Sequence, residues 1–238
     1  NAALPAGDGA NFLDKTPRYY FAIPELFRVF PEAHYILHFR NPLAVLVSIL
    51  TTWVRGEWLG LGNARVDLLE APQRLLAGRE ILGARAIEVH YEDLVNHPEE
   101  VMKTICCQLE LDYVPEMIMY GQLDLPHWQH ADQKSVYRYD RPEPSHADQW
   151  IDHLTHPQFW RLAHDYLQLL GPVIVSSMRY DFEALLKMIT PYTPSWPARL
   201  FTFSFEWLAQ RPPQKRAFWE RRLVWFVRRF LQPEIKAR

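Results

Sequence analysis

The sequence predicts an α/β protein built around a parallel sheet. Tyr35–Phe39 is a compact run of β-branched and aromatic residues, which is typical of a strand that is covered on both faces, and Ala86–His90 is expected to be a second strand. The stretch between them carries helical spacing and is long enough for a crossover connection. Strand, helices and strand in this order predict a right-handed βαβ unit. A chain of 238 residues is long enough for one sizeable core, with or without a small appendage.

Helices are expected directly before and after the first strand. The preceding helix should end before Pro31, and its apolar positions are Ile23, Leu26, Phe27 and Phe30. Asn41 is a favourable N-cap and Pro42 a favourable first helical residue, so a helix over residues 43–54 should begin immediately after the strand. Arg40 therefore falls where the strand ends and the helix begins.

The remaining elements follow from spacing and breaker residues. Helices are expected over residues 67–82, ending near Gly83, and over residues 98–109. Residues 121–146 are irregular and polar, which predicts a long loop, and long loops in compact domains are more often functional than idle. Helical spacing resumes over residues 148–170, where Pro157 is expected to divide the stretch in two.

The composition is that of an ordinary folded protein. It is 48% hydrophobic and 23% charged with a formal net charge of −2, which suggests no nucleic-acid partner. No apolar run approaches the roughly 20 residues that cross a bilayer, so the chain is not expected to span a membrane. Cys106 and Cys107 are adjacent and cannot form an unstrained disulfide with each other. A reducing, cytoplasmic setting therefore fits best.

The C-terminal segment differs from the rest of the chain. We expect an α/β domain over residues 1–190 and a basic, aromatic, helical extension over residues 191–238. Beyond Pro191 ten Lys and Arg residues face three Glu residues, so this part carries +7 and the preceding part −9. Such a segment can lie on an anionic membrane surface as a peripheral contact, dock on a partner, or cover the acidic body of its own domain.

Arg40 and Ser48 are the most informative pair of residues. Open α/β sheets bind ligands at the carboxyl ends of their strands, where a following helix adds oriented N–H groups. Arg40 could bind a phosphate there, and Ser48, two helical turns onward, could donate a further hydrogen bond. The spacing alone is equally compatible with a surface ion pair at Arg40 and simple packing at Ser48.

Two strings resemble one known family. The string F-R-N-P-L-A-V-L-V-S from position 39 resembles the motif by which sulfotransferases hold the 3′-phosphate of their donor, with Arg40 and Ser48 on the binding positions. The string D-K-T-P-R-Y from position 14 is similar to the D/E-K-T/S-P-x-Y segment of the bacterial, carbohydrate and tyrosyl-protein branch. In that branch the acidic residue is proposed as the base, which implies Asp14, and Lys15 would lie beside the transferring group.

The resemblance implies a fold, a co-substrate and a reaction. The fold would be a P-loop-NTPase-like three-layer sandwich, and the reaction would move a sulfuryl group from 3′-phosphoadenosine 5′-phosphosulfate (PAPS) to a hydroxyl or amine. The acceptor could be a small molecule, a carbohydrate or a peptide. Sulfuryl transfer needs a base for the acceptor and a cation for the leaving oxygen. A neighbouring lysine favours the ionised form of a carboxylate. Without the downstream motif, Asp14 and Lys15 would read as a solvated pair.

Weaker parts of the resemblance lie further along the chain. The string Y-E-D-L from Tyr91 resembles an element after a later strand of the family, where Asn96 is expected to cap the next helix. The polar loop resembles the region that places basic residues against the 3′-phosphate and adenine, and its candidates are Lys134, Arg138 and Arg141. No metal is expected, because no carboxylate or cysteine completes a set with the histidine pairs.

The family's Gly-rich phosphosulfate-binding loop is not found before Phe12. The chain as given is therefore expected to be truncated at its N-terminus and to lack half of the donor site. Three interpretations stay open: part of a complete sulfotransferase, a catalytically inactive nucleotide-binding or regulatory pseudoenzyme, and a P-loop kinase relative.

Overall fold

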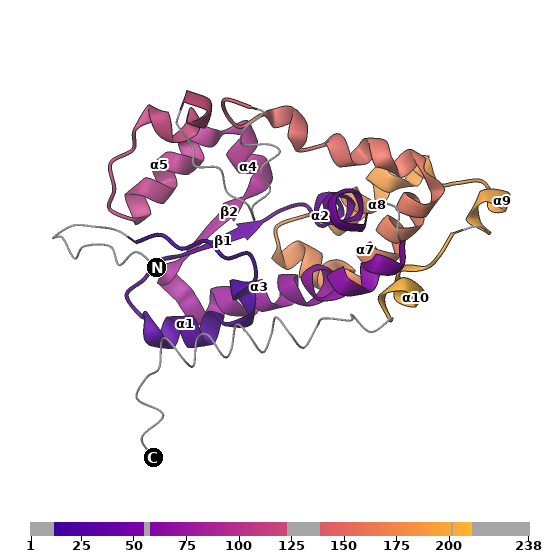
Figure 1. The fold of residues 1–238 in the computed structure, drawn as a ribbon, viewed down its shortest axis with the longest axis horizontal. Helices are drawn as coiled ribbons and strands as arrows, with labels where there is room; N and C mark the ends of the chain where they lie inside the picture. The colour runs from indigo at the N-terminus through magenta and orange to yellow at the C-terminus, as the bar shows by residue number, and fades with distance from the viewer. Residues whose placement is uncertain (1–11, 55–57, 123–138, 201, 211–238) are drawn as a thin grey trace, which may run out of the picture.

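The computed structural model describes residues 12–54, 58–122, 139–200 and 202–210. The described chain is a mostly helical α/β structure with a small parallel sheet (Figure 1). Its helices and strands are α1 (Ile23–Val29), β1 (Tyr35–Phe39), α2 (Pro42–Ile49), α3 (Ala71–Leu82), β2 (Ala86–His90), α4 (Tyr91–Asn96), α5 (Pro98–Gln108), α7 (Pro157–Ser177), α8 (Phe182–Ile189), α9 (Trp196–Arg199) and α10 (Phe205–Ala209). Short 3₁₀ and π segments lie at Tyr19–Phe21, Leu50–Val54, Trp58–Ala64, Val66–Glu70, Gly83–Arg85, Pro115–Ile118, Tyr120–Gln122, Pro144–His146, Gln149–Thr155 and Thr190–Tyr192.

The sheet confirms both predicted strands. Within the described ranges it has two strands, which pair in parallel with Tyr35 opposite Ala86 and Phe39 opposite His90. Because the strands run in the same direction, their carboxyl ends meet at one edge of the sheet. That edge carries Arg40 after the first strand and Tyr91 after the second.

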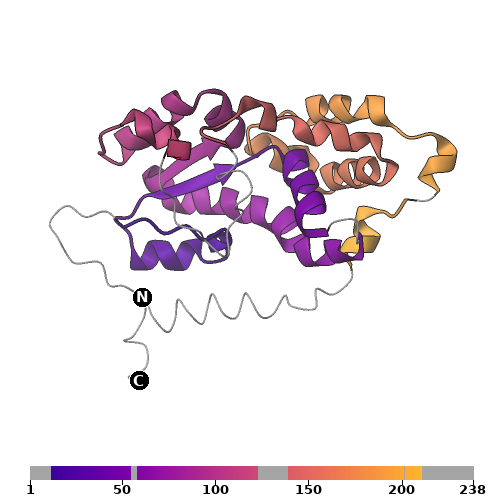
Figure 2. The same ribbon diagram turned by 45° about the horizontal axis from the view of Figure 1, so that its top comes forward.

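Helices cover both faces of the sheet, with α1 and α3 on one side and α4 and α5 on the other (Figures 1 and 2). On the first side Leu37 and Phe39 pack in a cluster with Ile23 and Leu76. On the second side Ile87 and Val89 pack against α5 through Ile105, Val101, Met102 and Leu109. The sheet side chains alternate between the two faces because the strand period is two.

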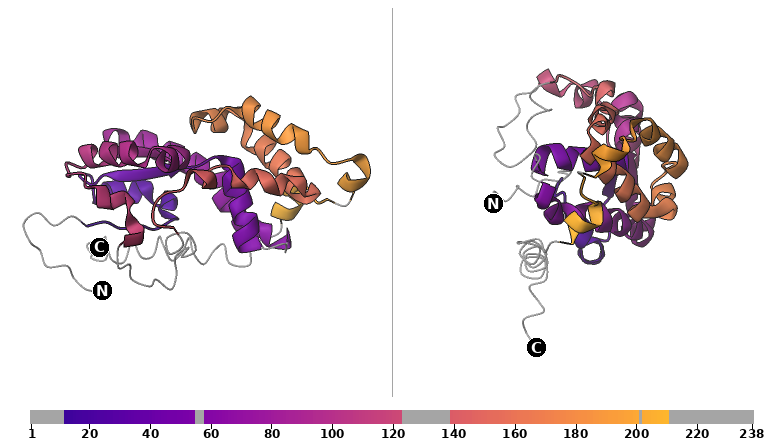
Figure 3. Two further views of the ribbon diagram at one scale, coloured as in Figure 1. Left: turned by 90° about the horizontal axis from the view of Figure 1, so that it is seen from above. Right: turned by 90° about the vertical axis from the view of Figure 1, so that its right-hand side faces the viewer.

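A second, larger core lies among the helices at the other end of the molecule (Figure 3). It joins α2 to α7, α8 and α10, and its fully buried members include Leu43, Leu46, Leu162, Leu167 and Phe205. Most side chains of α2 are apolar because this helix runs from the edge of the sheet into the helical core. Phe205, in α10, belongs to the same core, although it follows Pro191 in the sequence.

The predicted helices are confirmed with changes at their ends. The helix expected over residues 43–54 is α2, which continues as a π turn over Leu50–Val54. Pro157 does divide the later stretch, since it is the first residue of α7. At the end of the expected stretch the chain kinks at Gly171 (φ 74°), and a second helical run from Pro172 reaches Ser177.

The expectation that Asn96 caps the following helix is wrong. The Y-E-D-L string begins α4, and Asn96 is the last residue of that helix. His97 is the N-cap of α5, and its side chain makes no capping hydrogen bond there. Pro98 at the first helical position fixes the start of α5 instead.

Candidate functional site

Arg40 lies at the turn between β1 and α2. Asn41 is the N-cap of α2, as predicted, and its side-chain oxygen accepts a hydrogen bond from the Leu43 N–H at 3.0 Å. Pro42 follows as the first helical residue. The turn is short and capped, so the guanidinium of Arg40 is held at the carboxyl edge of the sheet.

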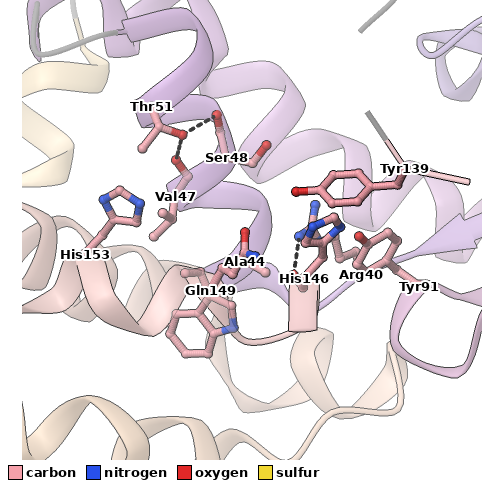
Figure 4. A pocket seen from close by; sticks show the side chains of 11 residues that line it. Arg40, Ala44, Val47, Ser48, Thr51, Tyr91, Tyr139, His146, Gln149 and His153 are labelled. Carbon is pink, nitrogen blue, oxygen red and sulfur yellow. Dashed lines mark hydrogen bonds between the residues drawn. The ribbon is translucent and has the colours of Figure 1, made fainter. Parts of the chain in front are cut away.

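This edge opens onto a hollow of about 290 Å³ (Figure 4). The volume is near the lower end of the range for small-molecule sites. Its described lining residues are Arg40, Ala44, Val47, Ser48, Thr51, Tyr91, Tyr139, His146, Gln149, Trp150 and His153. Arg40 and Ser48 thus lie on the same hollow, and the exposed Ser48 is within the same helix that Arg40 precedes. No acidic residue is among these lining residues, so the hollow favours an anion.

The guanidinium of Arg40 has one aromatic and one polar neighbour. Its central carbon lies 4.1 Å from the centroid of the Tyr91 ring, which is a cation–π distance. Its Nη2 donates to the backbone oxygen of His146 at 3.5 Å, a long contact. Its Nε is buried and has no hydrogen-bond partner among the described residues. Arg40 therefore has donor capacity to spare.

Tyr91 adds a polar group to the same edge. Burial raises the pKa of its hydroxyl, with the nearby Arg40 acting in the opposite direction. The hydroxyl therefore stays protonated near neutral pH. A protonated hydroxyl can donate to an oxyanion held by Arg40.

The structure places Asp14 and Lys15 elsewhere. Both side chains are exposed, and neither is among the described lining residues of the hollow. The hydroxyl of Tyr19, the tyrosine of the same string, donates a hydrogen bond to Asp14. Burial and this bond to Asp14 raise the pKa of Tyr19, so it remains a donor to the carboxylate. Tyr19 therefore orients Asp14.

Asp67 holds the segment that carries Asp14 in place through hydrogen bonds to Arg18 and Tyr20. Arg18 donates to both carboxylate oxygens of Asp67, through Nε at 3.0 Å and Nη2 at 2.5 Å. Tyr20 donates to the same carboxylate at 2.5 Å. Burial, followed by the hydrogen bond to Asp67, raises the pKa of Tyr20 above its ordinary value. This anchor was not expected from the sequence, because Arg18 and Asp67 are far apart along the chain.

The loop candidates have different outcomes. Lys134 and Arg138 lie outside the described residues. Arg141 is exposed and is not among the described residues that line the hollow. Sequence reasoning did not single out Tyr139, His146, Gln149 or Trp150, which reach the hollow from the end of that loop and the 3₁₀ segment after it. Only the irregular, polar character of the loop gave a signal for them.

No three His, Cys, Asp or Glu side chains in the described part of the chain gather closely enough to hold a metal ion. None of the described helices combines the length and the apolar content needed to cross a membrane.

The fold and this edge define an α/β protein whose parallel strands end at a hollow that carries an arginine and, among its described lining residues, no carboxylate. Comparison with known proteins shows which family this part of the chain is similar to. The signature described as "Sulfotransferase family" matches residues 2–115 of the chain. The resemblance drawn from the two sequence strings is thereby confirmed.

Among curated proteins, Nodulation protein NoeE of Sinorhizobium fredii (strain NBRC 101917 / NGR234) is similar to part of the chain. The two are 42% identical over 50 residues, which make up 21% of this chain and 12% of that protein. The chain therefore matches a small part of that relative's length. No solved structure matches the chain.

Proposed function

We propose that the protein is a sulfotransferase, which transfers a sulfuryl group from PAPS to a hydroxyl or amine acceptor. The observation that carries the proposal is Arg40, whose buried Nε has no partner in the described residues and whose side chain shares a hollow with Ser48. The match of residues 2–115 to the sulfotransferase family signature supports the same function. On this proposal the helix-covered parallel sheet is part of a P-loop-like three-layer sandwich.

The residues at the hollow fit the 3′-phosphate of the donor. Arg40 offers a positive charge and a free donor, and Ser48 and Tyr91 offer hydroxyl groups on the same lining. Charge-assisted hydrogen bonds of this kind are about twice as strong as neutral ones. Arg141, together with Lys134 and Arg138, remains a candidate for contacts to the same nucleotide from the loop.

Asp14 and Lys15 would carry the acceptor side of the reaction. The bound donor supplies an activated sulfuryl group attached through a bridging oxygen. The acceptor oxygen bonds to sulfur as the bond to the bridging oxygen breaks, and Asp14 takes the acceptor proton. Lys15 stabilises the negative charge that develops on the bridging oxygen. Tyr19, which donates to Asp14, would keep the carboxylate oriented.

Binding of adenosine 3′,5′-bisphosphate, measured by calorimetry, tests the donor half of the proposal. Arg40→Ala should weaken binding by about 2–3 kcal/mol, because a charge-assisted contact is lost. Arg74→Ala is the matched control, since Arg74 makes an exposed ion pair with Glu70 in α3 and does not line the hollow. Equal affinities in the two variants would show that Arg40 does not hold the nucleotide.

Transfer of sulfuryl groups tests the catalytic half. Asp14→Asn should abolish nearly all transfer while leaving bisphosphate affinity unchanged, because the carboxylate acts on the acceptor and not on the nucleotide. Unchanged turnover in that variant would remove Asp14 as the base. Bisphosphate binding by the unaltered protein without transfer to any acceptor would instead support a nucleotide-binding pseudoenzyme.

A further inference from the structure

Trp150 lines the same hollow as Arg40 and also carries a buried donor without a partner among the described residues. Its side chain is only 3% exposed, and it lies in the 3₁₀ segment Gln149–Thr155. Its indole N–H is buried and has no hydrogen-bond partner among the residues that the structure describes. Two residues that line one hollow, Arg40 and Trp150, thus come from distant parts of the chain, and each carries a buried nitrogen donor without a partner among the described residues.

Such groups are rare in folded proteins because an unpaired buried donor costs roughly 1–3 kcal/mol. The fold satisfies comparable groups elsewhere in the same core. Trp160 Nε1 donates to the backbone oxygen of Ile189 at 3.0 Å, and the hydroxyl of Tyr166 donates to the backbone oxygen of Leu68 at 3.0 Å. The unpaired indole of Trp150 therefore differs from these two side chains of the same helical core, and outside the hollow Nε2 of His90 is another buried nitrogen without a partner among the described residues.

The missing partner must be an acceptor. Both unpartnered groups are donors, Arg40 brings a positive charge, and the described lining contains no carboxylate. An oxyanion carries several acceptor oxygens and a negative charge. It can therefore accept from both donors, pair with the charge of Arg40 and meet no repulsion from the described lining. The existing contact from Arg40 to the His146 oxygen is long at 3.5 Å, and a charged oxygen would be a stronger partner.

We infer that Trp150 is a ligand-binding residue that donates its indole N–H to the oxyanion held by Arg40. The inference rests on the proposed function, because it names a further residue of the same nucleotide site. The indole of Trp150 would add a neutral donor on a rigid ring to the charged donor of Arg40. A rigid donor loses little conformational entropy when the ligand binds, so Trp150 would sharpen the selection of a phosphate group.

The test is Trp150→Phe, which removes the N–H and keeps most of the ring. Affinity for adenosine 3′,5′-bisphosphate and for inorganic phosphate should fall about tenfold to a hundredfold, as for the loss of a hydrogen bond to a charged group. Thermal stability without ligand should be unchanged or higher, because an unpaired buried donor has been removed. Trp160→Phe is the matched control and should behave in the opposite way, losing stability while keeping phosphate affinity.

The outcomes separate this inference from the proposed function. If Arg40→Ala loses bisphosphate affinity and Trp150→Phe binds as tightly as the unaltered protein, the inference is overturned and the proposed function stands. If the protein binds inorganic phosphate through Trp150 but not the bisphosphate, the inference stands and the proposed donor fails. Absence of binding to both ligands, or a stability loss in Trp150→Phe equal to that in Trp160→Phe, overturns the inference.

Discussion

Asn41 and Glu92 hold together two segments that lie 51 positions apart in the sequence. The backbone N–H of Asn41 donates to one carboxylate oxygen of Glu92 at 2.9 Å, and the hydroxyl of Tyr180 donates to the other at 2.7 Å. The F-R-N-P string and the Y-E-D-L string are therefore joined by a hydrogen bond. Glu92 fixes the turn from which Arg40 extends.

Glu92→Ala should destabilise the protein by about 2 kcal/mol, because it leaves the Asn41 N–H and the Tyr180 hydroxyl without their acceptor. Glu92→Gln should cost less, since the amide oxygen can still accept from Asn41. Chemical denaturation measures both changes. Glu99→Ala is the control, because Glu99 makes an exposed pair with Lys103, a class of contact that contributes about 0–1 kcal/mol. Equal losses in Glu92→Ala and Glu99→Ala would contradict the structural role of Glu92.

His90 should make stability fall in mild acid. The residue is 6% exposed, and its ring stacks on Phe39 with centroids 5.6 Å apart. Burial, followed by the charge of Arg179, lowers the pKa of His90 from its ordinary value of 6.5. The unfolded chain therefore takes up a proton at a pH where the folded chain does not. The contribution of neutral His90 to the free energy of unfolding is complete above pH 6.5 and is lost as the pH falls through the lower, folded-state pKa.

The measurement is the free energy of unfolding at pH 7.5 and pH 5.5, in the unaltered protein and in His90→Phe. The phenyl ring keeps the stack on Phe39 and cannot take up a proton. The unaltered protein should lose more stability between the two pH values than the variant does. A parallel loss in both proteins would show that other groups cause the acid dependence.

Local signals explain how much of the fold could be predicted. Strands Tyr35–Phe39 and Ala86–His90 have the predicted bounds, since β-branched and aromatic runs report on their own backbone. The Asn41 cap followed from a single residue type beside a proline. The prediction that Asn96 is a cap was wrong because capping depends on where the preceding helix ends. The sequence did not show that α4 occupies residues 91–96.

The candidate site was predictable only where both partners lie in one local string. Arg40 and Ser48 share a strand–helix unit, so their common hollow follows from the local fold. Glu92 bonds to the turn at Asn41, and Trp150 lines the hollow, although both residues are far from Arg40 in the sequence. Their positions depend on tertiary packing, for which residue spacing in one sequence carries no signal.

Gly78 should resist substitution because α3 crosses α1 at this position. A Cβ atom on Gly78 would lie 2.5 Å from Cδ1 and 3.2 Å from Cγ2 of Ile23, which is buried. Gly78→Ala should therefore destabilise the protein by about 1–3 kcal/mol, despite the better helix propensity of alanine. Ile23→Val removes Cδ1, so the same change should cost less in that background. A double-mutant cycle by thermal unfolding measures the coupling, and additive losses would contradict the predicted clash.

The last prediction concerns the basic C-terminal segment. Residues 211–238 of this segment lie outside the described residues. In its described part, Trp196 in α9 is 72% exposed, and Leu200, directly after α9, is 63% exposed. Exposed aromatic groups beside a basic, aromatic sequence are typical of a surface that binds anionic lipid headgroups.

We therefore expect the intact protein to co-sediment with vesicles that contain phosphatidylglycerol, and less with pure phosphatidylcholine. Because Phe205 and Leu208 are fully buried in the helical core, the informative deletion begins after Gln210 and not after Pro191. That deletion should abolish vesicle binding and leave bisphosphate affinity unchanged. High salt should weaken binding of the intact protein, since the attraction between basic side chains and anionic lipid is screened. Equal sedimentation of the intact and shortened proteins would assign the basic segment to contacts within the protein or with a partner.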